Sequence, residues 1–491
     1  MKNKLLLAGI ALLSISSLVG CSSDNGGDSG KLIIDFWHTF GDAVGDGVNE
    51  AARRFEKLVK DNEGVDLEIE AVANYTYKTA KSYLTPTLTA GTNCVMAVSY
   101  ADTVAELMAL ESTPGQYVVD MTSYLSNAEY GVGKDAYLGD RLPVSDYVQS
   151  YLEEGKVFDR DNGQYVMPFL KSTEIMLYNQ EAALKICEDY EPTKAMTEAQ
   201  RKEFLSKMSW DDLIALGRLA VENKTKYGFN ALEYPIYYDS DSNMVITQLE
   251  QLGIDYSKKD AQGNVVLGLD AGADAQNYAK AKKYFEDLVS WHQDGILTTK
   301  GINEGYASES FKSMKTIFTI GSSGGGGYSY PEAGSFTVGF ARVPYRGTNS
   351  ETPNYISQGP SVIFLKNKKL STELNNKKLL YAWKFYKYLT STQQNLILSV
   401  NKSKGYVPVR TSCYQSESWI TYMAKDENPS RSANIVVNVV NGHFLNSLVF
   451  KGSGTYRDGL STVVAEVCGG KSIDTKLADL INEVKLAMNG N

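Results

Sequence analysis

Short apolar runs alternate with longer amphipathic stretches along most of the chain. Residues 31–37 form an apolar run typical of a strand, and residues 65–72 alternate apolar and polar side chains as a half-buried strand does. Between them, residues 46–61 carry apolar side chains every three or four positions, which predicts a helix. A second helical stretch at 76–90 leads into the compact apolar run 94–98. This alternation predicts an α/β fold with a mostly parallel sheet covered on both faces.

The same pattern continues through the rest of the chain. A strand pair is expected within residues 163–178. Further strands are expected at 316–320, 336–343 and 361–365, and helices at 210–221, 279–293, 379–389, 456–467 and 475–488. We find no internal repeat, and the only low-complexity segments are residues 22–30 and the glycine run 324–327. The α/β pattern therefore continues along the chain from residue 31 onward.

The N-terminal segment does not follow this pattern. A short basic start is followed by an apolar run at 5–13 that is too short to span a bilayer, then by small residues and Cys21. This order resembles a bacterial lipoprotein signal, in which residues 1–20 are removed and Cys21 becomes the lipidated first residue. Residues 21–30 then read as a flexible tether. We expect a protein held at the cell membrane by its acyl chains, facing the extracellular or periplasmic side.

Length and charge narrow the class of protein. Removal of residues 1–20 from the 491-residue chain leaves 471 residues, enough for two or three domains. The net charge of −9 becomes −11 once Lys2 and Lys4 are removed. Such an acidic protein lacks the basic patch that nucleic acid requires, and it gains no attraction from anionic lipid. No later apolar run is long enough for a transmembrane helix.

Cysteine and histidine usage argues against a metal site. Four cysteines follow Cys21, none in a CxxC pair, and the chain has three histidines. One disulfide among the four is open, with free buried thiols the favoured reading; the four are Cys94, Cys187, Cys413 and Cys468. No zincin motif, P-loop or dinucleotide fingerprint is present, so we expect no cofactor.

Two local motifs suggest chemistry that their surroundings oppose. Residues 321–325 (GSSGG) match the nucleophile elbow of serine hydrolases, with His443 as the available histidine, but glycines and Pro331 follow where a helix should begin. A loop that contacts a ligand, or a plain surface loop, explains the same residues. The run from Asp239 to Asn243 approaches a calcium loop, but Met244 stands where that loop needs glycine, and a capped helix start fits equally well.

Seven short sequence motifs occur in a fixed order along the chain and serve as landmarks. They are Ile34-Asp35-Phe36-Trp37-His38, Ser99-Tyr100-Ala101-Asp102, Gly163 to Asn179 with Pro168-Phe169, Trp210-Asp211-Asp212-Leu213, Gly321-Ser322-Ser323, Gln358-Gly359-Pro360 and Gly405-Tyr406-Val407-Pro408-Val409. In this order they resemble the extracellular solute-binding proteins of bacterial ABC importers, in the maltose- and glycerol-3-phosphate-binding-protein-like group. The resemblance covers residues 31–470.

The resemblance implies a two-lobed α/β fold of the periplasmic-binding-protein type II class, with a hinge and a ligand cleft between the lobes. Open α/β sheets bind ligands at the carboxyl ends of their strands, which suits this arrangement. The expected first lobe comprises residues 31–168 and 342–390, and the second comprises 169–341 and 391–491. Chain crossings are expected at residues 168–172, 342–344 and 389–393.

The resemblance also implies a set of ligand contacts between the lobes. The expected residues are Trp37, His38, Asp102, Ser172, Thr173, Tyr234, Tyr237, Ser322, Ser323, Gly324, Gln358, Gly359 and Tyr456. Tyrosine is frequent, at 32 residues, and its ring can stack on sugar while its hydroxyl forms hydrogen bonds. Relatives that bind glycerol phosphate place an arginine in the segment matching residues 448–457, where Lys451 stands here. We therefore expect a neutral sugar rather than a phosphate ester.

The expected function is a carbohydrate-binding receptor. It captures a sugar or oligosaccharide, closes, and delivers it as a monomer to the permease subunits of an ABC importer, without catalysis. One alternative is a secreted hydrolase acting on glycosides or esters, either a serine hydrolase built on Ser323 and His443 or a glycosidase. Another is an adhesin or scaffold lipoprotein without a small ligand.

Overall fold

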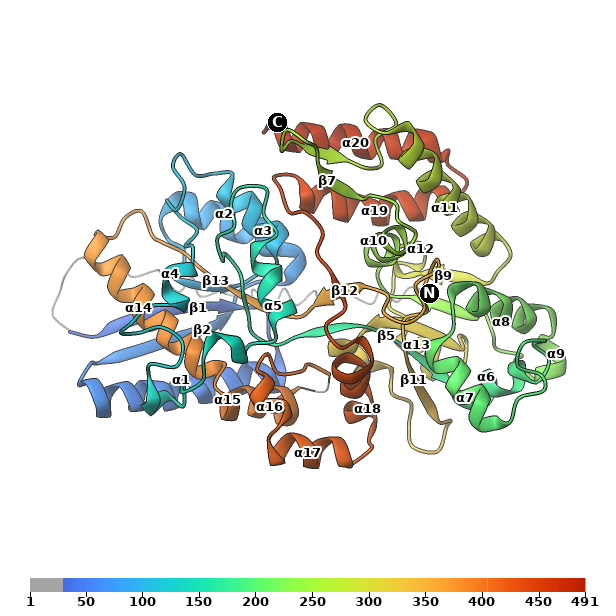
Figure 1. Ribbon diagram of the computed structural model, residues 1–491, viewed down its shortest axis with the longest axis horizontal. Helices are drawn as coiled ribbons and strands as arrows, with labels where there is room; N and C mark the ends of the chain where they lie inside the picture. The colour runs from blue at the N-terminus through green and yellow to red at the C-terminus, as the bar shows by residue number, and fades with distance from the viewer. Residues whose placement is uncertain (1–29, 404, 491) are drawn as a thin grey trace, which may run out of the picture.

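The computed structural model describes residues 30–403 and 405–490, which form two lobes side by side (Figure 1). The expected signal peptide, the lipidated Cys21 and nearly all of the tether lie outside the described residues. Within the described part, no helix is long and apolar enough to cross a membrane. The four cysteines that follow Cys21 are buried and free, as favoured from the sequence.

The first lobe is built on a five-stranded sheet with the order β2-β1-β3-β13-β4. Its strands are β1 (Leu32–His38), β2 (Leu67–Ala73), β3 (Met96–Val98), β4 (Met167–Pro168) and β13 (Ser361–Phe364). β1 runs parallel to β2 and β3, whereas β13 runs antiparallel to β3 and β4. The prediction of a mostly parallel sheet is therefore right: β4 runs in the same direction as the first three strands, and only β13 is reversed.

Helices pack on this sheet as the sequence pattern predicted. The principal ones are α1 (Asp42–Glu63), α2 (Ala80–Ala90), α3 (Ala101–Met108) and α14 (Thr372–Leu389). Alternate residues of β1 are buried and β1 packs against α14, while α1 packs against β2 and α14. Helix α1 ends where Gly64 adopts φ of 71° and its N–H donates to Lys60, a conformation that glycine reaches without steric cost. Short helices α4 (Thr122–Leu125) and α5 (Gln149–Glu153) complete this part of the chain.

The second lobe is built on a mixed sheet with the order β14-β12-β5-β10-β6-β9, and β11 also pairs with β5. The strands are β5 (Ser172–Asn179), β6 (Ile236–Tyr238), β9 (Leu297–Thr299), β10 (Phe318–Ser322), β11 (Val338–Arg342), β12 (Tyr355–Gln358) and β14 (Phe444–Leu445). All of β5 is buried, with Met176 opposite Ile320 on one side and Ala341 on the other. β7 (Ser257–Lys259) and β8 (Val265–Leu267) form a separate hairpin.

Helices surround the second sheet. They are α6 (Gln180–Cys187), α7 (Glu198–Lys207), α8 (Trp210–Glu222), α9 (Lys224–Tyr227), α10 (Asp241–Gln251), α11 (Ala275–Gln293), α12 (Lys300–Asn303), α13 (Ser308–Lys312), α19 (Ser453–Cys468) and α20 (Ile473–Asn489). Figure 1 shows α19 and α20 beside α11, on the far side of the sheet from α18 (Asn428–Asn434). The predicted helices over 210–221, 279–293, 456–467 and 475–488 are all present.

The chain crosses between the lobes at places that the sequence located only in part. The first crossing joins β4 to β5 through residues 169–171, as predicted. The second lies at Gly359 and Pro360, between β12 and β13, and the prediction of residues 342–344 is wrong because β11 and β12 both pair with β5. We therefore propose to move that domain boundary, expected at residue 342, to this second crossing.

The third crossing also begins later than the predicted residues 389–393. Helix α15 (Thr392–Leu396) and the π-helical turn η6 (Ile397–Lys402) pack on α14 and α1 of the first lobe. The backbone of Val407 then pairs with that of Lys171 in the first crossing. Helices α16 (Thr411–Tyr414) and α17 (Glu417–Ala424) lead to α18 and η7 (Ile435–Val440), which contact β11. The domain limits in this region remain a proposal.

Candidate functional site

Residues that follow three parallel strands of the first sheet gather where the lobes meet. Thr39 follows β1, Tyr77 follows β2 and Tyr100 follows β3. The carboxyl ends of parallel strands share one edge of a sheet, so these side chains come together. The rings of Tyr77 and Tyr100 stack with centroids 4.5 Å apart and an angle of 28° between their planes. Such a pair presents a flat aromatic surface with polar edges.

Residues of the crossings and the second lobe meet this pair. A hydrogen bond joins the backbone of Gly359 to the Tyr100 hydroxyl, and burial raises the pKa of that hydroxyl well above its usual range. Gly359 has φ of +99°, and a Cβ there would lie 2.5 Å from the Leu170 carbonyl oxygen, so only glycine fits this crossing. The Tyr406 ring lies over Gly324, where an added Cβ would come within 2.6 Å of the ring. Aromatic rings therefore approach the junction from both sides.

Helix α19 adds a charged residue to the junction. The Arg457 guanidinium donates a hydrogen bond to Asn243 Oδ1, and no carboxylate among the described residues lies within 4 Å of it. Asn243 in turn donates to Glu174 Oε1 at 2.8 Å, and the Tyr238 hydroxyl donates to the other oxygen of that carboxylate. Burial raises the pKa of Glu174 to about 7, while these two hydrogen bonds and Arg457 oppose the rise. Arg457 thus carries a charge that no direct ion pair neutralises.

We call these residues the interlobe cluster. It comprises Thr39, Tyr77, Tyr100, Gly324, Ser357, Gln358, Gly359, Tyr406 and Arg457. Four of its polar atoms are buried and make no hydrogen bond of normal geometry with any described residue: Thr39 Oγ1, Tyr77 Oη, Ser357 Oγ and Gln358 Oε1. Each such group costs about 1–3 kcal/mol unless water or a ligand binds it.

Part of the expected contact set lies around this cluster. The hydroxyl oxygens of Ser172 and Ser322 are 3.3 Å apart, and Ser323 Oγ donates to the Gly405 carbonyl at 3.0 Å. Thr173 Oγ1 donates to the Ile356 carbonyl at 2.7 Å. The structure therefore brings these predicted residues together with Gly324, Gln358 and Gly359 at the crossings.

The expected residues of β1 and α3 have partners elsewhere. Trp37 packs edge-on against Tyr83 at 5.3 Å. His38 is 2% exposed, and its Nδ1 accepts a hydrogen bond from the Phe40 N–H at 3.2 Å. Burial lowers the pKa of His38 to about 4, so the ring is neutral at pH 7. Asp102, expected to accept a sugar hydroxyl, accepts instead from Ser453 Oγ.

Three expected aromatic contacts pack inside the second lobe. Tyr234 stacks on His292 at 5.5 Å, and the Tyr237 hydroxyl donates to the Gly305 carbonyl. Tyr456 is fully buried and stacks on Tyr256 at 4.2 Å. Arg457, the next residue on the helix, faces the junction in its place, because neighbouring helical residues point about 100° apart. The sequence therefore pointed to this turn of α19 through Tyr456, whereas the residue of the turn at the junction is Arg457.

The cluster members that sequence reasoning missed each carried a weak signal. Tyr100 and Tyr406 lie within two of the quoted landmarks, and Tyr77 stands four residues after the end of a strand. Nothing local distinguishes them from the remaining tyrosines of a chain that has 32. Their proximity arises only when the two lobes are assembled.

The elbow and calcium motifs are engaged in structural roles. Ser323 is buried with its hydroxyl on a backbone carbonyl, and the His443 carbonyl accepts the Tyr355 N–H beside β14. Ser240 caps α10 by accepting the Asn243 N–H, and Asp241 accepts from Thr299 and from the Gly301 N–H. Among the described residues, no group of three or more His, Cys, Asp or Glu side chains could hold a metal ion.

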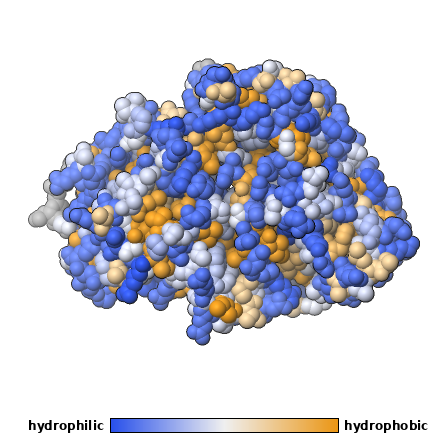
Figure 2. Space-filling model, viewed as in Figure 1, coloured by the Kyte–Doolittle hydropathy of each residue, from blue (hydrophilic) through white to orange (hydrophobic). Residues whose placement is uncertain are grey.

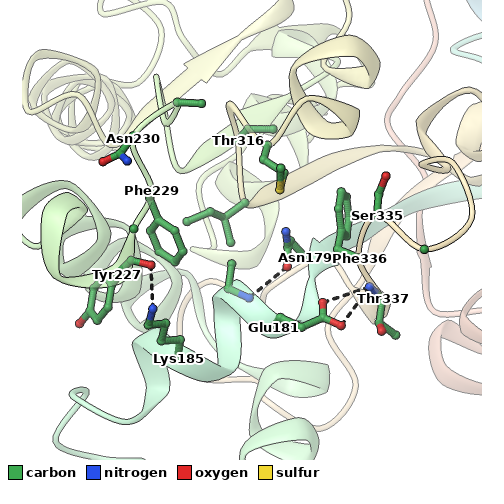
Figure 3. A pocket seen from close by; sticks show the side chains of 16 residues that line it. Asn179, Glu181, Lys185, Tyr227, Phe229, Asn230, Thr316, Ser335, Phe336 and Thr337 are labelled. Atoms are coloured by element: carbon green, nitrogen blue, oxygen red, sulfur yellow. Dashed lines mark hydrogen bonds between the residues drawn. The ribbon is translucent and has the colours of Figure 1, made fainter.

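A separate cavity lies within the second lobe. It has a volume of about 710 Å³ and is lined by residues of α6, by the segment 314–317 just before β10, and by the loops around Phe229 and Phe336 (Figure 3). Its charged side chains bind neighbouring backbone: Lys185 donates to the Tyr227 carbonyl, and Glu181 accepts from the Thr337 N–H. This cavity therefore lacks the unpartnered buried atoms that mark the interlobe cluster. Figure 2 shows hydrophobic patches near the middle of an otherwise largely hydrophilic face.

The fold is shared with solved solute-binding proteins. UgpB from Mycobacterium tuberculosis in complex with glycerophosphocholine gives a TM-score of 0.65 at 16% identity, over 94% of this chain and 99% of that one. The cyclic α-maltosyl-1,6-maltose binding protein from Arthrobacter globiformis gives 0.64 at 15% identity, over 94% and 100%. The maltose/maltodextrin-binding domain MalE from Bdellovibrio bacteriovorus bound to maltotriose gives 0.59 at 16% identity, over 94% and 99%. A sequence comparison with curated proteins finds no match.

The family itself is established by sequence. Residues 50–426 match the family described as bacterial extracellular solute-binding protein, and this match spans most of the chain. It rules out the hydrolase alternative, because the family consists of receptors that carry out no catalysis. The chain belongs to the bacterial extracellular solute-binding proteins, the receptors of ABC importers.

Proposed function

We propose that this receptor binds a carbohydrate between its two lobes at the interlobe cluster. The observation that carries the proposal is the set of four buried, unpartnered polar atoms next to the stacked rings of Tyr77 and Tyr100. A sugar offers hydroxyl groups for such atoms and a flat apolar face for a ring. Support also comes from the two solved relatives above that are named for maltose-type ligands.

In this proposal the affinity arises from replacing water by fixed partners. Hydroxyls of the ligand would bind Tyr77 Oη, Thr39 Oγ1 and Gln358 Oε1, while a sugar ring stacks on the tyrosine pair. Closure of the lobes would bury these bonds and change the surface that the permease meets, so the bound state would be favoured by its differential contacts. A monomer tethered to the membrane through Cys21 would then deliver the sugar to the permease subunits.

A thermal-shift screen across sugars and polyols tests the proposal. A ligand that binds only the folded state must raise the unfolding midpoint. We expect at least one sugar to do so, and Tyr77→Ala to abolish the shift. The matched control is Tyr306→Ala, a tyrosine that is 64% exposed in the second lobe, which should leave the shift intact. If no sugar shifts the midpoint, the carbohydrate proposal fails.

Arg457 favours a second candidate, an anionic polyol ester. The expected absence of an arginine in segment 448–457 rested on Lys451, but the Lys451 ammonium lies beside Gly490 at the end of α20. Arg457 is the residue of that segment at the junction, and its planar donor fork suits a phosphate. The structure of UgpB contains glycerophosphocholine, an ester of this class.

Glycerophosphocholine and maltotriose distinguish the two candidates. Under the second candidate, glycerophosphocholine binds and Arg457→Gln weakens it by about tenfold to a hundredfold, since a charged hydrogen bond contributes about 1.5–3 kcal/mol. Under the first candidate, maltotriose or another neutral sugar binds and glycerophosphocholine does not. Titration calorimetry with both compounds measures this.

The membrane anchor has its own test. Cys21→Ser should release the protein from the membrane fraction while leaving ligand binding intact. Loss of binding in that variant would contradict the role of residues 21–30 as a tether.

A further inference from the structure

The N-terminus of helix α19 has no cap within its own segment. Its N-cap residue is Gly452, with φ of 97° and no side chain, and its first turn holds no acidic residue. The first backbone N–H groups of a helix need partners and carry a partial positive charge. The Ser453 N–H donates to the Phe450 carbonyl at 2.9 Å, whereas the Gly452 N–H takes its acceptor from another part of the chain.

Helix α3 of the first lobe supplies one acceptor for a backbone N–H and one for a side-chain hydroxyl at this terminus. Glu106 Oε1 accepts the Gly452 N–H at 2.9 Å, and Asp102 Oδ1 accepts Ser453 Oγ at 2.8 Å. Lys81, on α2, holds the other oxygen of Glu106 at 3.2 Å and so fixes its direction. Figure 1 shows α3 facing the start of α19 across the junction. One carboxylate of the first lobe therefore caps a helix of the second, and another binds the first side chain of that helix.

We propose that these contacts form a latch that holds the two lobes in the closed arrangement and breaks when they open. The latch comprises Asp102, Glu106, Gly452 and Ser453. Both of its sides are helices packed on their own lobes, so rotation of one lobe against the other must separate them. Opening then leaves the start of α19 uncapped and two carboxylates without helix partners, which disfavours the open form.

The proposal does not depend on which solute is bound. The latch lies on the same helix as Arg457, two turns or less from it, so making the latch also fixes the turn that faces the interlobe cluster. It further explains why Asp102, expected to bind ligand, is occupied by Ser453.

A designed disulfide tests the contact directly. A Cβ built on Gly454 lies 3.8 Å from Asp102 Cβ, which matches the usual Cβ separation in a disulfide of about 3.8 Å. In the full-length protein, D102C/G454C should form a crosslink on oxidation, detected by mass spectrometry of the denatured chain. The four thiols that follow Cys21 are buried and should remain unreacted. Small-angle scattering should then show a smaller radius of gyration for the oxidised form than for the reduced form.

Neutral variants test the energetics without a crosslink. D102N/E106Q should shift the closed-to-open ratio towards open by about fivefold for each carboxylate, read by fluorescence energy transfer between dyes on the two lobes. The matched control is Asp479→Asn, an acidic residue of α20 whose ion pair with Lys476 lies within one helix; it should leave the ratio unchanged.

Three results would overturn the latch. One is failure of D102C/G454C to crosslink. Another is identical scattering from its oxidised and reduced forms, which would make this contact a fixed pivot. The third is an unchanged lobe ratio in D102N/E106Q. If D102N/E106Q fails to fold, the disulfide measurement decides alone. None of these readouts uses a ligand, so the latch and the carbohydrate proposal succeed or fail separately.

Discussion

Two polar regions, one inside the first lobe and one between the lobes, differ in how completely their groups are paired. Behind the third crossing, Lys387 is fully buried and donates to the Tyr130 and Gly131 carbonyls and to Asp135. Asp140 lies between Lys387 and Arg410, at 3.4 and 3.3 Å. At the interlobe cluster, in contrast, four buried polar atoms make no hydrogen bond of normal geometry with any described residue.

This difference distinguishes polar groups that stabilise the fold from polar groups that are available to bind a ligand. The ion network joins α14, the loop around residue 135 and the chain just after Val407, so it ties the third crossing to the first lobe. Its charges are compensated by the protein itself. The interlobe cluster leaves its groups open at the point where the crossings meet, which is where a solute would supply the partners.

The largest effect is expected from a substitution that disrupts the buried ion network around Lys387. Lys387→Met removes the cation between Asp135 and Asp140, which leaves Asp135 with Lys384 alone at 3.6 Å and Asp140 with Arg410 alone at 3.3 Å. We expect the free energy of unfolding to fall by about 3–5 kcal/mol, measured by urea denaturation. Lys57→Met is the control, because that lysine is exposed and its pair with Asp61 is worth under about 1 kcal/mol. A similar small loss in both variants would mean that the network is not structural.

The next effect concerns His38, a buried side chain that is intermediate between the two regions because only one of its two ring nitrogens is hydrogen-bonded. His38 Nδ1 is bound and Nε2 is not, and burial lowers its pKa to about 4. The unfolded chain takes up a proton near pH 6.5 that the folded chain refuses, so stability from His38 is present above pH 6.5 and is lost as the pH falls towards 4. The loss should reach about 3 kcal/mol.

Urea denaturation between pH 7.5 and 4 measures this effect. His38→Gln cannot titrate and should show a shallower decline across that window than the parent protein. Parallel curves for the two proteins would contradict a neutral, buried His38.

The smallest effect sharpens the comparison with one matched pair of substitutions. Tyr147→Phe removes a hydroxyl bonded to Arg410 and Thr390, so we expect a loss of about 1 kcal/mol in unfolding free energy. Tyr77→Phe removes a hydroxyl with no normal partner, so stability should change by less than about 0.5 kcal/mol. The affinity for a sugar that raises the unfolding midpoint of the parent protein should instead fall about fivefold to tenfold in Tyr77→Phe. A stability loss without an affinity loss would assign Tyr77 to the core.

Much of the fold was predictable because the hydrophobic periodicity of a strand or a helix is visible in a short stretch of sequence. The alternation in 65–72 became β2, and the amphipathic run in 46–61 became part of α1. The second crossing was misplaced because β11 and β12 have the same local pattern as strands of either sheet. Their assignment follows from pairing with β5, a contact between residues far apart in the chain.

For the candidate site, too, local features were predictable from the sequence, whereas contacts between the lobes were not. The serine and glycine loop at 322–324 and the glycine of the second crossing were identified as landmarks and do meet at the junction. Tyr456 and Arg457 could not be separated, because a helix places neighbouring residues on different faces and the sequence does not say which face meets the other lobe. Asp102 was located correctly but given a ligand as partner, whereas α19 of the other lobe occupies it.

The sequence by itself determined the family, the α/β class and most of the element order, since these depend on local periodicity and on short pieces in a fixed order. Tertiary structure alone decided where the chain changes lobes, which charges are paired and which polar atoms stay open. Those properties depend on contacts between distant segments: Arg410 with Asp140, Gly359 with Tyr100, and α3 with α19. A single sequence carries no signal for them, because pairing energy arises only when the partners meet.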